Sequence, residues 1–227
     1  STDFSIRAST VGVNTANFLS GDIAVCESCM KEFNAPGNKR YEYPFICCTH
    51  CGPRYSIIKR LPYDRNNTKM VEFEMCPQCE VEYRSSGDRR FHAQTNCCPD
   101  CGPILKLLDA RGNTVDSSDP AKMARELIRR GKILGVKGIG GYHLCCNAED
   151  PVAVQRLRKL KHRPQKPLAI MARDIEAVYK ICEVSGLEKA ILIGSRKPIL
   201  LLRKKVTEYL SEDIAPKQKR LGVMLPY

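Results

Sequence analysis

The sequence has no tryptophan, and its aromatic content is only 7%. This scarcity leaves few flat side chains on which nucleic-acid bases could stack. The chain also lacks an apolar run near the ~20 residues that a membrane-spanning helix requires. Its first residues, STDFSIRAST, lack the basic start and apolar core of a secretory signal. These absences argue against a membrane protein and predict a cytoplasmic one. With 43% hydrophobic residues among 227, the chain can bury one sizeable core or two modest ones.

Cysteine, in contrast, is abundant, with 13 residues. Eight of them form four Cys-x2-Cys pairs, and the spacing of the first two pairs repeats after 50 residues. In a reducing compartment such pairs indicate metal binding rather than disulfide bonds. The eight positions are Cys26, Cys29, Cys48, Cys51, Cys76, Cys79, Cys98 and Cys101.

The repeat extends beyond the cysteines, which indicates a duplicated module. The matching positions are Glu32 and Glu82, Gly37 and Gly87, Arg40 and Arg90, Tyr41 and Phe91, and Gly52-Pro53 and Gly102-Pro103. Each module is too small to bury a core of its own. We therefore expect metal binding to supply folding free energy, on the order of 10 to 16 kcal/mol for a zinc finger.

Zinc is the expected ion because it favours four soft ligands arranged in a tetrahedron. We assign Cys26, Cys29, Cys48 and Cys51 to one Zn²⁺ and the other four cysteines to a second, since the duplication makes each module self-contained. A cross-braced pairing is the alternative. Four thiolates leave no open coordination position, which predicts structural rather than catalytic zinc. An iron–sulfur cluster fits less well, because cluster-binding cysteines are usually spaced more closely.

The remaining cysteines and two histidines are interpreted as non-ligands. Two cysteines stand beside ligands at matching positions of the repeat, and three in the second half have no partner at metal spacing and are interpreted as buried apolar residues. These residues are Cys47, Cys97, His50, His92, Cys145, Cys146 and Cys182.

The positive charge is concentrated in the second half of the chain. Residues 26–101 carry 11 lysines and arginines against 10 acidic residues, whereas residues 102–227 carry 25 against 13. Eight thiolates on two Zn²⁺ would make the cysteine region net acidic. Because phosphate neutralisation supplies most nucleic-acid affinity, this charge predicts a scaffold rather than a nucleic-acid-reading finger.

The second half alternates apolar segments typical of strands with segments of helical periodicity, which predicts an α/β domain. Asp119 is a candidate N-cap, with Pro120 at the first helical position and Gly131 after the helix. The expected strands cover residues 104–109, 133–137, 142–146, 167–171 and 198–202, and the expected helices cover residues 121–132, 151–161, 174–182 and 187–194.

Two segments of this domain carry candidate chemistry. KGIGGYH, residues 137–143, has glycines that could let the backbone approach a ligand, but no Gly-Lys-Ser/Thr follows. RLRKLKHRPQKPLAIM, residues 156–171, carries six cations and no acid. Its prolines end the helix, so Lys161, Arg163 and Lys166 lie on a rigid connector that favours phosphate binding. A solvated surface is the alternative.

Several of these segments together resemble a known family. YPFICCTHCGPRYSII, LPYDRNNTKM and RRFHAQ, with the eight-cysteine spacing, resemble the zinc-finger region of the HypF-type carbamoyltransferases that mature [NiFe] hydrogenases. KGIGGYHLCCNA, LRKLKHRPQKPLAIM and LGVMLPY resemble that family's YrdC-like domain. The resemblance covers nearly the whole chain and implies a fold class of two zinc-ribbon-like modules followed by an α/β YrdC-like domain.

The resemblance also implies an activity and site residues. Such proteins use carbamoyl phosphate and ATP, with Mg²⁺, to form carbamoyladenylate, and pass the carbamoyl group to the C-terminal cysteine of the partner HypE. The family's Lys-x-Arg pair falls on Lys161 and Arg163, with Lys166 adjoining. Lys137 and His143 are weaker candidates for substrate contact. A zinc-stabilised RNA-binding module of YrdC type is the alternative function.

The resemblance also defines the expected division of the chain. The family's acylphosphatase-like domain, Ser-x-Asn motif and C-terminal kinase-like domain have no counterpart here, so we expect an internal fragment with a truncated YrdC-like domain. The expected segments are an N-terminal extension (1–25), a first zinc module (26–53), a connector (54–75), a second zinc module (76–103), a linker (104–119) and the YrdC-like nucleotide-binding domain (120–227).

The two-site assignment predicts the metal content of the protein. Elemental analysis of the purified chain should return two zinc ions per molecule, because each set of four thiolates completes one tetrahedral shell. One zinc ion, or none, would overturn the assignment.

Overall fold

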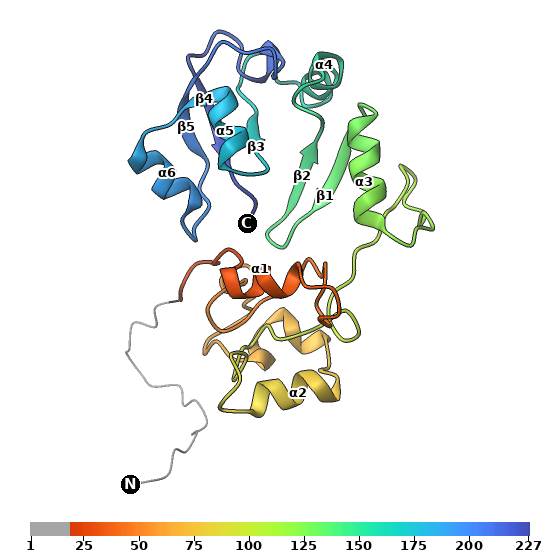
Figure 1. Cartoon of the computed structure of the whole chain (residues 1–227). Coiled ribbons are helices and arrows are strands. Elements are labelled where there is room, and N and C mark those ends of the chain that lie inside the picture. Colours follow the sequence, from red (N-terminus) through yellow and green to blue (C-terminus); the bar gives the residue numbers. More distant parts are fainter. Residues whose placement is uncertain (1–18) are drawn as a thin grey trace. The chain divides into compact units, whose positions relative to one another are not determined.

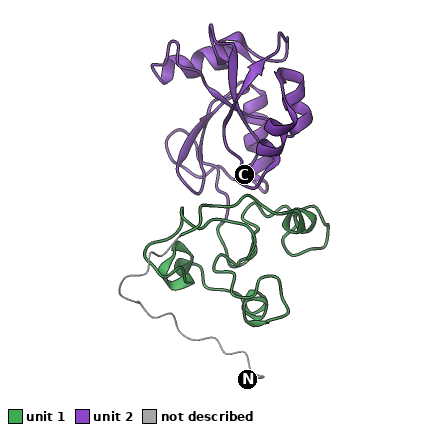
Figure 2. Ribbon diagram, turned by 90° about the vertical axis from the view of Figure 1, so that its left-hand side faces the viewer, with its two compact units in different colours: residues 1–103 green, residues 104–227 purple. Residues whose placement is uncertain are grey.

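The computed structural model describes residues 19–227, and the first 18 residues of the predicted N-terminal extension lie outside this part. The chain divides into two compact units, residues 1–103 and residues 104–227 (Figure 2). None of the helices in the described part is long and apolar enough to cross a membrane.

The first unit has little regular structure, and its two α-helices occupy equivalent positions of the repeat. Helix α1 (Glu27–Phe33) starts directly after Cys26, and helix α2 (Pro77–Arg84) starts after Cys76 with proline in its first turn. Short 3-10 helices, η1 (Arg65–Asn67) and η2 (Lys69–Glu72), lie in the connector between the modules. The sequence did not predict α1 and α2, because each is only about two turns long (Figure 1).

Glycine is required after the second cysteine pair of each module. The backbone of Gly52 has a φ of +102°, and a Cβ atom there would lie 2.8 Å from the Cβ of Cys47. At the equivalent Gly102, a Cβ atom would lie 2.3 Å from the hydroxyl of Tyr43 and 2.7 Å from the Cβ of Cys97. Close packing thus explains the glycine at both positions of the repeat.

The two modules and their connector share one core. Buried residues of the first module pack with Ile57 and Met70 of the connector and with Cys97 of the second module. The expectation that each module is self-contained is therefore wrong for packing. The cluster consists of Cys29, Tyr43, Ile46, Cys47, Cys48, Cys51, Ile57, Met70 and Cys97.

The second unit contains two sheets. Strands β1 (Leu134–Lys137) and β2 (Tyr142–Cys145) form an antiparallel hairpin. The other sheet has the order β3-β6-β5-β4, in which β3 (Ala169–Met171) is parallel to β6 (Arg220–Met224). Strand β5 (Leu200–Lys204) is antiparallel to both of its neighbours, β6 and β4 (Cys182–Glu183) (Figure 1).

The helices of this unit are α3 (Pro120–Arg129), α4 (Pro151–Leu160), α5 (Ile175–Ile181) and α6 (Gly186–Ile193), with a short 3-10 helix η3 (Glu212–Ile214). Each α-helix starts at a side-chain N-cap, which satisfies free backbone donors of its first turn. The caps are Asp119, Asp150, Asp174 and Ser185. A buried apolar cluster that includes Val154, Val178, Leu192, Leu202 and Val223 joins α4, α5 and α6 to the larger sheet.

Most predicted elements of the second unit are present, with two kinds of exception. The predicted strand over residues 104–109 is wrong, because only an isolated bridge between Leu108 and Thr114 forms there. Strands β4 and β6 were not predicted. Cys182 is fully buried as expected, and burial raises the pKa of its thiol to about 11. Cys145 and Cys146 are only half-buried.

Candidate metal centres and nucleotide site

The predicted ligands come together as two separate groups of four sulfur atoms. The groups are Cys26, Cys29, Cys48 and Cys51, and Cys76, Cys79, Cys98 and Cys101, and within each group the sulfur atoms lie within 4.8 Å of one another. The grouping follows the modules, so the structure contains no cross-braced pairing in the described residues.

The sulfur positions match a tetrahedral zinc shell. Neighbouring sulfur atoms are 3.5–3.8 Å apart in the first group and 3.7–3.8 Å apart in the second. Four thiolates at a Zn–S distance of ~2.3 Å would lie about 3.8 Å from one another. The donor set and its geometry therefore fit one Zn²⁺ in each module.

The neighbouring cysteines and histidines lie outside both groups, as expected. Cys47 and Cys97 are buried where the modules pack together. The thiol of Cys47 lies 3.0 Å from the Thr95 hydroxyl, and Cys97 lies 3.6 Å from the Tyr43 hydroxyl. These two cysteines are therefore not ligands, and they form part of the packing contact between the modules.

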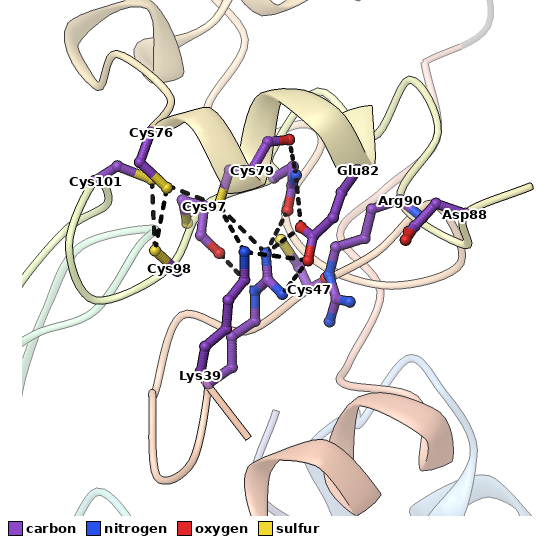
Figure 3. A network of polar contacts seen from close by, with 12 residues as sticks. Lys39, Cys47, Cys76, Cys79, Glu82, Asp88, Arg90, Cys97, Cys98 and Cys101 are labelled. Atoms are coloured by element: carbon purple, nitrogen blue, oxygen red, sulfur yellow. Dashed lines mark hydrogen bonds and ion pairs between the residues drawn. The ribbon is translucent and has the colours of Figure 1, made fainter. Parts of the chain in front are cut away.

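Basic side chains cross from the first module to the ligands of the second. The Arg40 guanidinium is 2% exposed and donates to the Glu82 carboxylate at 2.6 and 3.0 Å. It also donates to the Cys79 sulfur at 3.4 Å and the Cys97 carbonyl oxygen at 2.8 Å. The Lys39 ammonium lies 3.6 Å from the same Cys79 sulfur and 3.2 Å from Glu82 (Figure 3).

The second module makes corresponding contacts with the first, except that only Arg40, and not Arg90, donates to a sulfur atom in the described residues. Arg89 donates to the Cys29 sulfur at 3.2 Å and pairs with Glu32 at 2.7 Å. Arg90, also buried, donates to the Cys47 carbonyl oxygen at 3.1 Å and pairs with the Glu32 carboxylate. The repeated glutamates and arginines therefore face each other across the two modules, and not within one.

These ion pairs keep both glutamates charged. Burial of Glu82 raises its pKa, but the hydrogen bonds and charge of Arg40 outweigh burial and lower the pKa to about 2. Burial opposes ionisation of Glu32 in the same way, and Arg90 and Arg89 lower its pKa. A partner's removal would leave a buried charge uncompensated, which is strongly destabilising.

The basic connector follows α4, where the sequence placed it. We call residues 161–168 the basic loop; Lys161 is the C-cap of α4, and the loop leads into β3. Leu168 donates its backbone N–H to Ile214 at 2.9 Å, which fixes the end of the loop.

Arg158 holds the basic loop and was missed as a structural residue. Its side chain is 7% exposed and donates to the carbonyl oxygens of Arg163 at 2.8 Å and Lys166 at 3.1 Å. It also donates to the carbonyl oxygens of Asp213 and Ile214. From the sequence, Arg158 was counted only as one of the six cations of residues 156–171 and was given no separate role. In the structure Arg158 lies on the face of α4 that also buries Val154.

The side chains of the three candidate cations of the basic loop, unlike that of Arg158, are not held by the contacts that order the loop. None of the ion pairs of residues 19–227 involves Lys161, Arg163 or Lys166. Arg163 lines an open depression of about 440 Å³, whereas the other two do not line it. The depression is formed by Gln155, Arg158, Lys159, His162, Arg163 and Pro164.

Lys137 and His143 lie on the β1–β2 hairpin. Lys137 lies over the Tyr142 ring at 5.6 Å, and His143 contacts the Tyr227 hydroxyl at 3.3 Å. Among the described residues, no hydrogen bond or ion pair joins either side chain to the basic loop. The structure thus does not bring all five candidate residues into contact.

Comparison with known families matches both units. The family described as HypF finger matches residues 25–58 and 75–108. The family described as telomere recombination, which comprises Sua5, YciO and YrdC domains, matches residues 126–227. The chain therefore combines two four-cysteine zinc-finger modules with an α/β domain of YrdC type.

Whole proteins with this combination are similar to the entire chain. Carbamoyltransferase HypF of Synechocystis is 50% identical over all 227 residues, which cover 30% of that protein. The crystal structure of T.kodakarensis HypF has a TM-score of 0.89 at 48% identity, over 94% of this chain and 28% of that one. Full-length HypF in its phosphate- and nucleotide-bound form has a TM-score of 0.86 at 48% identity, over 92% of this chain and 27% of that one.

The chain therefore matches the zinc-finger and YrdC-type regions of HypF proteins, as its motifs predicted, and it spans under a third of the length of these relatives.

Arg158 can be tested through stability. Arg158→Met should lower the free energy of unfolding of the second unit by about 1–3 kcal/mol, because buried carbonyl oxygens lose their hydrogen-bond donor. Urea unfolding followed by circular dichroism measures the change. Arg129→Met is the matched control, because the Arg129 side chain is 74% exposed and its one ion pair within residues 19–227 is with Glu126. Equal stability of the two variants would contradict the role given to Arg158.

Proposed function

We propose that the chain is the central part of a cytoplasmic enzyme that forms carbamoyladenylate from carbamoyl phosphate and ATP. The carbamoyl group would then pass to the C-terminal cysteine of a HypE partner. The observation that carries this proposal is the 50% identity to a carbamoyltransferase HypF over the whole chain. The spacing of the eight cysteines and the Lys-x-Arg pair in the basic loop support it.

In this proposal the two Zn²⁺ ions are structural. Cys26, Cys29, Cys48 and Cys51 would hold one ion, and the other four cysteines of the repeat would hold the second. Four thiolates fill the tetrahedral shell, so no position remains for water or substrate. The chemistry that zinc supplies is the binding energy that shapes two modules with little secondary structure.

The basic loop would bind the phosphates of Mg²⁺-ATP. In the parent enzyme, water would first hydrolyse carbamoyl phosphate to carbamate and inorganic phosphate. Lys161, Arg163 and Lys166 would neutralise the ATP phosphates while a carbamate oxygen attacks the α-phosphorus. A new P–O bond forms, the bond between the α- and β-phosphates breaks, and pyrophosphate leaves. Stabilisation of the charge on the phosphoryl oxygens is the main service that a protein offers such a transfer. Because Arg158 fixes the loop carbonyls, the backbone of the loop needs little reorganisation when ATP binds.

The β1–β2 hairpin is the proposed second wall of the substrate site. Lys137 and His143 are exposed, and both project from the strands that flank the glycine-rich turn. The φ of Gly141 is +155°, which suits glycine at this turn. Lys137 and His143 would contact carbamate or nucleotide from this side.

A double substitution in the full-length enzyme tests the nucleotide site. Lys161→Ala with Arg163→Ala should abolish carbamoyl-phosphate-dependent exchange of pyrophosphate into ATP, because the reacting α-phosphate and the leaving pyrophosphate lose two counter-charges. Lys189→Ala with Lys180→Ala is a control of equal charge change on exposed helical positions.

The uncompensated cations of the basic loop also favour RNA binding. The exchange assay, together with RNA affinity measured at several salt concentrations, separates adenylation from RNA binding. Normal exchange in the double variant would remove Lys161 and Arg163 from the ATP site. RNA affinity that falls steeply with salt, without any exchange activity in the unmodified enzyme, would replace adenylation by the RNA-binding function.

A further inference from the structure

Each sulfur group receives a basic side chain from the opposite module. Lys39 and Arg89 occupy equivalent positions of the repeat, and they lie 3.6 Å from the Cys79 sulfur and 3.2 Å from the Cys29 sulfur, respectively. Arg40 adds a second donor at Cys79. The pattern is therefore reciprocal, and neither module supplies these cations to its own site.

The chemistry of the ligands makes these contacts energetically important. A Zn²⁺ ion with four thiolates carries two units of excess negative charge, and Cys29 and Cys79 are fully buried. Water cannot solvate charge at these sulfur atoms, so nearby cations must compensate it. Hydrogen bonds to metal ligands from outside the shell typically change metal affinity by about 10- to 100-fold.

The loop that carries each cation is shaped by its own module. In the first module, the Asn38 side chain accepts from the Arg40 backbone N–H at 2.8 Å. The Glu42 backbone N–H donates to the Phe33 carbonyl oxygen at 2.9 Å. These bonds tie the loop to the end of α1, which starts at the ligand Cys26.

The second module repeats this arrangement. The Asp88 side chain accepts from the Arg90 backbone N–H at 2.7 Å. The His92 backbone N–H donates to the Tyr83 carbonyl oxygen at 3.0 Å. Metal bound in one module therefore fixes the loop whose cations contact the other module's ligands.

We propose that the two metal sites bind zinc cooperatively, because each occupied module positions the counter-charge of the other site. This inference rests on the proposed zinc binding. It adds a property that two independent fingers would lack, because loss of one Zn²⁺ would lower the affinity of the remaining site for the second.

Partly exposed cations provide the cleanest test, since their removal should leave the fold intact. Lys39 and Arg89 are 26% and 28% exposed. In the full chain loaded with Cd²⁺, Arg89→Gln should shift the ¹¹³Cd resonance of the Cys26 site, and Lys39→Gln that of the Cys76 site. Cys26→Ser and Cys76→Ser assign the two resonances. Arg84→Gln is the control, because Arg84 is 76% exposed, pairs within its own module and contacts no sulfur atom in the described residues.

Competition with a zinc-binding dye measures the affinities. Lys39→Gln and Arg89→Gln should each weaken the opposite site about 10- to 100-fold. Removal of one site, by Cys76→Ser with Cys98→Ser or by Cys26→Ser with Cys48→Ser, should weaken the remaining site by a similar factor. A remaining site with unchanged affinity, or resonances that shift in the substituted module itself, would overturn the cooperativity while leaving zinc binding in place. Failure of the unmodified chain to bind either ion would instead overturn the metal sites themselves.

Discussion

The first unit depends on buried arginines that cross between its two modules. Arg40 and Arg90 are almost fully inaccessible, and each joins a glutamate and a carbonyl oxygen of the opposite module. Such a cation is costly to bury unless it is paired and fully hydrogen-bonded. Here the paired groups lie beside thiolates that need positive charge. The duplication therefore creates a mutual arrangement in which each copy compensates the charge of the other, and a single copy would lack it.

The spacing of the repeat predicted the ligands and their grouping, because two Cys-x2-Cys turns suffice to close one tetrahedral shell. The repeat also contained Glu32, Glu82, Arg40 and Arg90, but sequence could not tell whether each glutamate pairs within its module or across. That choice depends on how two folded modules pack. Cys47 and Cys97 show the same limit: their repetition reflects a shared packing contact, and they resembled bystanders only while the modules were considered separately.

In the second unit, periodicity predicted the α-helices, and Asp119 was also predicted as the cap of α3. The caps of the other three helices, Asp150, Asp174 and Ser185, were not predicted. The segment 104–109 is apolar enough for a strand but finds no neighbouring strand, and local composition cannot reveal that. Arg158 had a signal that was overlooked: it lies four residues after Val154 and next to Leu157, on the buried face of α4. Arg158 thus orders the loop carbonyls. Lys161, Arg163 and Lys166 have no carboxylate partner among residues 19–227, an arrangement suited to phosphate.

The account requires bound metal to shape both modules together while the second unit folds on its own core. Amide hydrogen exchange in the presence and absence of a strong zinc chelator tests this requirement directly. Metal removal should raise exchange throughout residues 26–101, in both modules at once, and leave the buried strands and helices of residues 104–227 protected. Unchanged protection of residues 26–101 after complete loss of metal would contradict the account.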